Sequence, residues 1–184
     1  MNNTSVRYFD QQVHELMYDI LHNGYKNHNE RTGETVTSLF GPQMRFDLRG
    51  GHIPLLTTKK MFTKGILIEL LWYLKATGDI SELKDNNVHI WDQWADEHNN
   101  LGPVYGVMWR KWPTITHNLD GSVTIGELDQ LQRVIDTLKN DPSDRRMIVT
   151  AWNPDLVPDN TKTFSENVAN GKQALPPCSY LVYG

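Results

Sequence analysis

The sequence predicts an α+β fold in which helices pack on a mixed β-sheet. Apolar residues recur at helical spacing in some segments, and in others they form the short alternating or continuous runs that are typical of strands. The composition is that of a globular chain, with 39% hydrophobic and 22% charged residues. A length of 184 residues indicates a single domain over 1–184, long enough to bury a core.

Three longer helices and one short helix are predicted. The segment 7–23 has its apolar residues at helical spacing, and Gly24 is expected to end this helix. The segment Phe62–Lys75 is apolar almost all round, which predicts a buried helix. A short helix is expected over 80–84, and apolar positions from Leu128 to Leu138 define the last amphipathic helix.

Four strands complete the predicted fold. Val36–Phe40 has strand composition, and Met44–Leu48 alternates between apolar and polar side chains, which predicts a half-buried strand. Met147–Trp152 is a short apolar run that fits a buried strand, and Cys178–Tyr183 is expected to form another. The connections are predicted to be a polar loop over 27–34, a loop-rich segment over 85–112 and a surface insertion over 154–173.

Charge and cysteine content restrict the function classes. The chain has 18 basic and 22 acidic residues, a net charge of −4, which argues against a general nucleic-acid binder. A small anionic ligand stays possible, because a local arginine cluster can work inside an acidic chain. The single cysteine excludes an internal disulfide and favours the cytoplasm. The longest apolar run, Gly65–Leu74, is too short to span a bilayer and contains Glu69.

Two residues stand out as candidates for catalysis. Cys178 follows Pro176 and Pro177, which fix the backbone and hold the sulfur in one place. A nearby arginine would favour its thiolate, although a lone cysteine is also compatible with a small buried apolar residue. Glu69 interrupts the apolar helix, so its carboxylate is expected at a cleft wall, where it could relay a proton, or in a structural pair.

Other segments could bind a ligand. Arg145 and Arg146 precede a predicted strand, where adjacent side chains would point opposite ways, and arginine suits phosphate oxygens. A solvated turn with surface ion pairs is the other interpretation of these two residues. Arg31 lies in a loop with a glycine and could also meet an anion, although an ordinary turn explains it better. The segments Trp91–Trp94 and Leu101–Trp109 are rich in rings that stack on flat ligands or anchor loops. Together these features suit an enzyme acting on a nucleotide and a second aromatic ligand.

Seven motifs, in order along almost the whole chain, resemble the thymidylate synthase family. They are Asn29–Gly33, Pro54–Lys60, Glu69–Leu74, Asn87–Asp96, Leu101–Gly106, Ser143–Asn153 and Ala174–Cys178. The resemblance implies methylation of the uracil ring of dUMP at C5, with 5,10-methylenetetrahydrofolate as carbon donor and reductant, and no metal. It implies Cys178 as the nucleophile that adds to uracil C6. Glu69 is implied to assist proton transfers near uracil O4, and Tyr105 to lie beside the nucleophile.

The resemblance also implies binding positions. Arg31 is similar to a phosphate ligand from the same subunit, and Arg145 and Arg146 are similar to arginines that reach the phosphate across a homodimer interface. The positions implied for folate are Lys59 at the glutamate tail and Ile90, Trp91 and Trp94 at the ring.

Three departures from the family pattern leave alternatives open. Ser179 stands where the family usually has histidine, and the segment between Trp152 and Cys178 is longer than usual. The chain also ends six residues after Cys178, so we expect a truncated form, inactive and aggregation-prone alone, that lacks the base-reading region. A dUMP or dCMP hydroxymethylase of the same fold and a catalytically dead nucleotide-binding fragment are therefore the alternatives.

Overall fold

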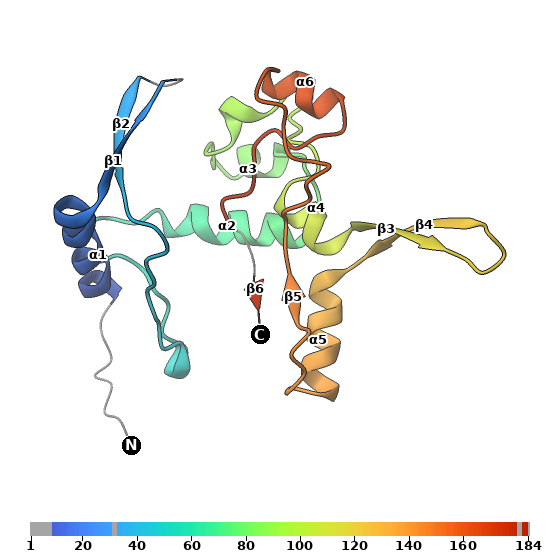
Figure 1. The fold of residues 1–184 in the computed structure, drawn as a ribbon, viewed down its shortest axis with the longest axis horizontal. Helices are drawn as coiled ribbons and strands as arrows, with labels where there is room; N and C mark the ends of the chain where they lie inside the picture. The colour runs from blue at the N-terminus through green and yellow to red at the C-terminus, as the bar shows by residue number, and fades with distance from the viewer. Residues whose placement is uncertain (1–8, 31–32, 180–181, 184) are drawn as a thin grey trace. The chain divides into compact units, whose positions relative to one another are not determined.

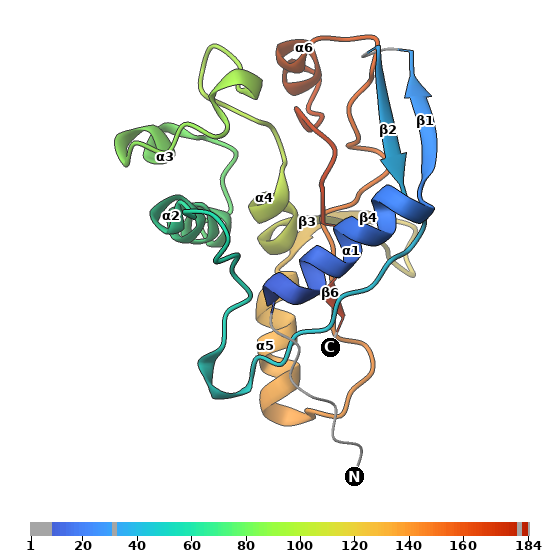
Figure 2. The same cartoon turned by 90° about the vertical axis from the view of Figure 1, so that its left-hand side faces the viewer.

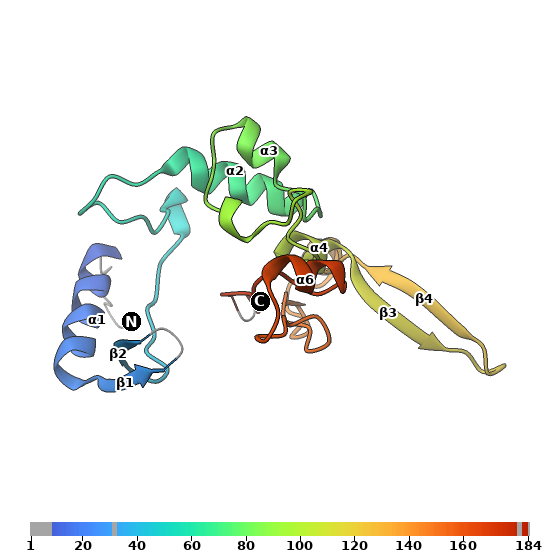
Figure 3. The ribbon, with the colours of Figure 1, turned by 90° about the horizontal axis from the view of Figure 1, so that it is seen from above.

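The computed structural model describes residues 9–30, 33–179 and 182–183, and the chain divides into two compact units, 1–62 and 63–184. Figures 1–3 show the elements of each unit. The predicted α+β class is confirmed, because each unit combines helices with antiparallel strands. Within the described ranges, no helix is long and apolar enough to cross a membrane.

The described part of the first unit contains one α-helix, one β-hairpin and one short 3₁₀ helix. Its elements are α1 (Phe9–Asn23), β1 (Tyr25–Asn29), β2 (Glu34–Ser38) and the short 3₁₀ helix η1 (Arg49–Gly51). Figure 2 shows β1 and β2 side by side, in a register that runs from Tyr25 opposite Ser38 to Asn29 opposite Glu34. The helix predicted over 7–23 is confirmed over 9–23, since residues 7 and 8 lie outside the described part, whereas the loop predicted over 27–34 is wrong in its strand residues. All five side chains of β1 are exposed, so this strand lacks the alternation of buried apolar and exposed polar residues from which a strand is predicted.

The strand predicted over Met44–Leu48 does not form. The Arg45 backbone N–H donates to Gln12 Oε1 (2.8 Å), and Gln12 Nε2 donates to the Arg45 carbonyl (2.7 Å). The amide of this buried glutamine therefore replaces a neighbouring strand. The apolar side of the segment packs locally, with the rings of Phe9 and Phe46 5.2 Å apart.

The second unit holds the main core. Its helices are α2 (Thr63–Leu74), α3 (Ser81–Asp85), η2 (Asp92–Trp94, 3₁₀), α4 (Tyr105–Arg110), α5 (Gln130–Asn140) and α6 (Phe164–Ala169). Its strands are β3 (Trp112–His117), β4 (Val123–Leu128), β5 (Ile148–Val149) and β6 (Val182–Tyr183). The largest fully buried apolar side chains are Trp72, Ile80, Leu83, Leu101, Met108 and Val88. The core thus lies where α2, α3, α4 and the loops that join them meet.

The strands pair differently from the predicted mixed sheet. Those that the structure describes form three separate two-stranded antiparallel sheets, β1–β2, β3–β4 and β5–β6. The β3–β4 hairpin extends away from α4 in Figure 3, and the loop-rich prediction for 85–112 missed α4. Among the described residues, two of each predicted C-terminal strand pair, Ile148 with Tyr183 and Val149 with Val182, while residues 180 and 181 lie outside the described part.

Helix α2 is in the predicted place, but the predicted burial is wrong. Only Gly65 and Trp72 of α2 are buried. The helix packs on α3 and α4 through one face, so the apolar residues of its other faces are 41–57% exposed. Those residues are Ile66, Leu67, Leu70, Leu71 and Leu74.

Residues 154–173, predicted as an insertion, include α6. This helix begins at a capping box in which Thr163 and Glu166 each accept from the other's backbone N–H. Asn167 is buried, and its side chain bonds the backbone of Asp159 in both directions (2.8 and 3.0 Å). The segment is thus folded on itself and has its own polar core.

Candidate active site

Five of the residues singled out by composition, spacing or resemblance lie in the second unit, near the contact of α2 with α4. Glu69 comes from α2, Trp91 and Trp94 from the turn around η2, Tyr105 from the start of α4, and Cys178 from the C-terminal segment. Cys178 is exposed, so its thiol is accessible to a ligand.

The carboxylate of Glu69 is half-buried and held by two donors. Trp91 Nε1–H donates to Glu69 Oε1 at 2.7 Å, and the Tyr73 hydroxyl donates to the same oxygen at 3.0 Å. Both predicted settings of this residue are therefore partly right, since the group is at the edge of the core and is also paired. Burial, together with the charge of Glu69, raises the pKa of the Tyr73 hydroxyl well above its usual value, so this hydroxyl stays a donor.

The backbone of the cysteine is fixed by a tyrosine. The Cys178 N–H donates to the Tyr105 hydroxyl oxygen at 2.6 Å. Burial raises the pKa of Tyr105 to about 12, and the Cys178 thiol and the Glu69 charge add to the shift. Cys178 and Glu69 thus each lie within electrostatic reach of Tyr105, which brings groups suited to nucleophilic addition and proton transfer to one cluster.

Aromatic rings surround these groups. Tyr105 contacts the rings of Tyr73, Trp91 and Trp109, with centroids 5.0, 6.1 and 6.3 Å apart. Trp91 and Trp94 meet edge to face at 5.7 Å. These tilted and edge-to-face contacts are the favoured arrangements of aromatic pairs, and they leave the cluster rigid.

A glycine lets the two helices approach closely. A Cβ atom on Gly106 would lie 2.8 Å from the Tyr73 Cα and nearer still to its carbonyl oxygen. Only glycine therefore permits this approach, which brings Tyr105 against Tyr73. The far end of α4 is also tied to α2, since Arg110 donates to the Leu74 carbonyl (3.0 Å).

The segment that leads to the cysteine is anchored upstream. Gln173 is completely buried, and its Nε2 donates to the carbonyls of Pro103 (2.9 Å) and Ala151 (3.3 Å). The next residue continues the tie, because the Ala174 N–H donates to the Leu101 carbonyl (2.9 Å). The chain from this anchor to the nucleophile is short and contains two prolines, which restricts where the sulfur can lie.

The predicted anion ligands come from different parts of the chain. Arg145 and Arg146 are exposed in a turn rather than in the predicted extended segment, and Arg146 Nη1 pairs with Asp144 (3.2 Å). Lys59 is exposed in the first unit, and Arg31 lies outside the described residues. Ile90 precedes Trp91 and is 44% exposed, so it presents an apolar surface to solvent.

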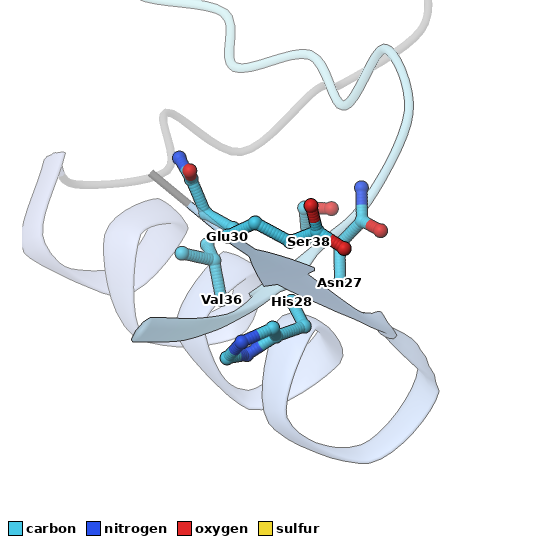
Figure 4. A pocket seen from close by; sticks show the side chains of 6 residues that line it. Asn27, His28, Glu30, Val36 and Ser38 are labelled. Atoms are coloured by element: carbon cyan, nitrogen blue, oxygen red, sulfur yellow. The ribbon is translucent and has the colours of Figure 1, made fainter. Parts of the chain in front are cut away.

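A hollow lies on the β1–β2 hairpin of the first unit (Figure 4). It is lined by Asn27, His28, Asn29, Glu30, Val36 and Ser38. Asn27 and His28 point to opposite sides of the hairpin, as neighbours on a strand do. Its described lining contains no lysine or arginine.

Three side chains that contact or anchor the candidate site residues were not given individual roles from the sequence: Tyr73, Trp109 and Gln173. Tyr73 lies four residues after Glu69, a spacing that places two side chains on one helix face, and this was the available signal. Gln173 gave no signal, because a glutamine in a polar segment resembles a surface residue until its burial is known.

An accessible thiol beside a carboxylate and a phenol, within an α+β fold, provides the groups that nucleophilic and general acid–base catalysis use. The comparison with known families agrees with this class. The family model described as Thymidylate synthase matches residues 11–183, and the chain belongs to the thymidylate synthase family. The family is in general folate dependent and acts in nucleotide biosynthesis as a transferase.

Proposed function

We propose that this chain carries the nucleophile site for reductive methylation of dUMP to dTMP. The observation that carries the proposal is the hydrogen bond from the Cys178 N–H to the Tyr105 hydroxyl, within the cluster that also holds Glu69. It supports the roles of an exposed nucleophile and a nearby proton carrier. We assign no metal to the reaction.

The chemistry explains the need for a thiolate. C5 of uracil is a weak nucleophile, because its electrons are delocalised into the ring carbonyl. When Cys178 sulfur bonds to C6, the electron pair of the C5–C6 double bond moves toward C4 and O4, and C5 becomes nucleophilic. Glu69 then holds and moves the proton near O4, and a proton leaves C5 before the sulfur is released.

The folate co-substrate supplies the one-carbon unit and the reducing equivalents when bound. The residues near Glu69 fit a flat ring, since Trp91 and Trp94 are only half-buried and Ile90 is exposed beside them. We assign Lys59 to the anionic tail of the folate because its ammonium group is exposed.

The nucleotide phosphate needs cationic partners. We assign Arg31 to the phosphate in the same subunit, and Arg145 and Arg146 to the phosphate bound by a second copy of the chain in a cytoplasmic homodimer. The exposure of both adjacent arginines supports this role, because side chains that serve another copy must lie on the surface.

The test is intact mass spectrometry of the protein after incubation with 5-fluoro-dUMP and 5,10-methylenetetrahydrofolate. Fluorine at C5 cannot leave as a proton does, so the covalent complex accumulates. We expect a mass gain equal to nucleotide plus folate, abolished in Cys178→Ser and kept in Ser179→Ala, the exposed neighbour. This expectation replaces that of an inactive chain, because the Cys178 N–H bonds the Tyr105 hydroxyl within the cluster that holds Glu69.

Two other results would contradict the proposal. A folded protein that binds 5-fluoro-dUMP without any covalent gain would be a nucleotide-binding protein. A protein that forms the complex but releases no dihydrofolate with dUMP or dCMP would be a hydroxymethylase, since dihydrofolate forms only when a hydride is transferred.

A further inference from the structure

One oxygen of the Glu69 carboxylate takes both of its hydrogen bonds. Oε1 accepts from Trp91 Nε1–H at 2.7 Å and from the Tyr73 hydroxyl at 3.0 Å. No group in the described part of the chain bonds Oε2. A carboxylate held by two donors through one oxygen cannot rotate, so its other oxygen points in a fixed direction.

Tyr73 is placed to hold this oxygen firmly. It lies one turn after Glu69 on α2, which brings the two side chains onto the same helix face. Its ring packs against the rings of Tyr105 (5.0 Å) and Trp109 (5.4 Å), which also contact each other (6.3 Å). The hydroxyl keeps its proton because burial raises its pKa, so it can act only as a donor to the carboxylate.

We propose that Tyr73 is a positioning residue for Glu69: together with Trp91 it fixes Oε1 and leaves Oε2 as the oxygen that exchanges the proton with the pyrimidine. This inference rests on the proposed function. Tyr73 itself does not touch the substrate in this scheme. It sets the direction of the group that does.

A purely structural role makes a different prediction. The Tyr73 ring packs against two other rings, and phenylalanine would fill the same space without the hydroxyl. If packing were the only role, Tyr73→Phe would behave as wild type. If the hydroxyl positions Glu69, the loss must appear in the proton-transfer steps and must depend on Glu69.

The first experiment is a kinetic double-mutant cycle with Tyr73→Phe and Glu69→Gln. We expect kcat to fall about tenfold in Tyr73→Phe, because a misdirected proton carrier slows the chemistry. KM for dUMP should stay within about twofold, since phosphate and ring contacts are untouched. In the Glu69→Gln background, Tyr73→Phe should cause no further loss.

The matched control is Tyr18→Phe, which removes an exposed hydroxyl in the first unit and should leave kcat unchanged. An equal loss from Tyr73→Phe with and without Glu69 would overturn the inference. So would a Tyr73→Phe enzyme with wild-type kcat.

The second experiment needs no activity. The indole ¹⁵N–¹H resonance of Trp91, assigned through Trp91→Phe, reports its bond to Glu69 Oε1. We expect the resonance to move in Tyr73→Phe, because the oxygen then serves one donor instead of two. Adding Tyr73→Phe to Glu69→Met should leave it unchanged, because methionine has no oxygen for the two donors to share. An unmoved resonance in Tyr73→Phe would overturn the inference.

The two proposals fail in distinguishable ways. A wild-type protein without adduct or product refutes the proposed function, and the Trp91 resonance then decides the role of Tyr73. A wild-type protein that makes product, with Tyr73→Phe equally active, refutes only the inference.

Discussion

The close approach of α4 to α2 at Gly106 makes a quantitative prediction. An alanine there would place its Cβ 2.8 Å from the Tyr73 Cα, whereas ordinary contact begins at 3.4 Å. The helices must therefore separate by at least 0.6 Å, and by more at the Tyr73 carbonyl oxygen. Since both partners are backbone atoms, no side-chain rotation can relieve the overlap.

Gly106→Ala is thus expected to affect stability and function unequally. Overpacking costs roughly 1–3 kcal/mol, while alanine regains about 1 kcal/mol in a helix, so the net loss in the free energy of unfolding is about 0–2 kcal/mol. The rate of adduct formation should fall more than the stability. Tyr105 directly precedes Gly106 and accepts the hydrogen bond from the Cys178 N–H, and a displacement approaching 1 Å can slow chemistry about 10²-fold.

The assay pairs urea denaturation with the rate at which the 5-fluoro-dUMP adduct forms. Gly126→Ala is the control, because its Cβ meets only the flexible Thr114 hydroxyl, at 3.2 Å. We expect this control to keep both quantities near wild type. A Gly106→Ala protein that forms the adduct at the wild-type rate would refute the view that this approach positions the nucleophile.

Two further predictions follow from the buried polar groups. The free energy of unfolding should fall as pH rises above about 10. Tyr105 ionises there in the unfolded chain, whereas in the folded protein its hydroxyl keeps its proton up to a pKa of about 12. Denaturation measured from pH 8 to 11 should therefore show a smaller fall for Tyr105→Phe than for wild type. Gln173→Met should destabilise the fold by about 1–3 kcal/mol, because it leaves the Pro103 and Ala151 carbonyls unpaired. The control Gln43→Met, at an exposed position, should not destabilise it. Equal denaturation midpoints for the two variants would contradict this prediction.

Helices with one apolar face were predictable from the sequence, and exposed hairpins were not. The apolar residues of the segments that became α1 and α5 recur at the helical period, although the buried residue of each helix is a glutamine, Gln12 and Gln130. The β1–β2 hairpin is exposed on both faces, so no burial pattern marks it. Met44–Leu48 alternates as a strand would, yet the side chain of Gln12 takes the place of its partner strand.

The candidate site divides in the same way. Cys178, Glu69 and Tyr105 were predicted because their residue types carry recognisable chemistry in motifs that resemble a family. Tyr73 was not, because a tyrosine in an apolar helix resembles a core residue, and only the structure shows where its hydroxyl points. Gly106 carries no chemistry of its own, so its importance appears only when the distance to α2 is known.

Backbone packing between distant segments sets the position of the nucleophile. A Cβ on Gly78 would overlap the Gly102 carbonyl, and a Cβ on Gly102, at φ +73°, would overlap the Lys172 carbonyl. The three segments therefore lie backbone to backbone, and the Leu101 N–H donates to the Gly78 carbonyl (2.9 Å) between two of them. A side chain at either glycine would have to separate these segments and displace the chain that leads to Cys178. The cysteine thus depends on two glycines 76 and 100 residues before it, which no local motif around the thiol contains.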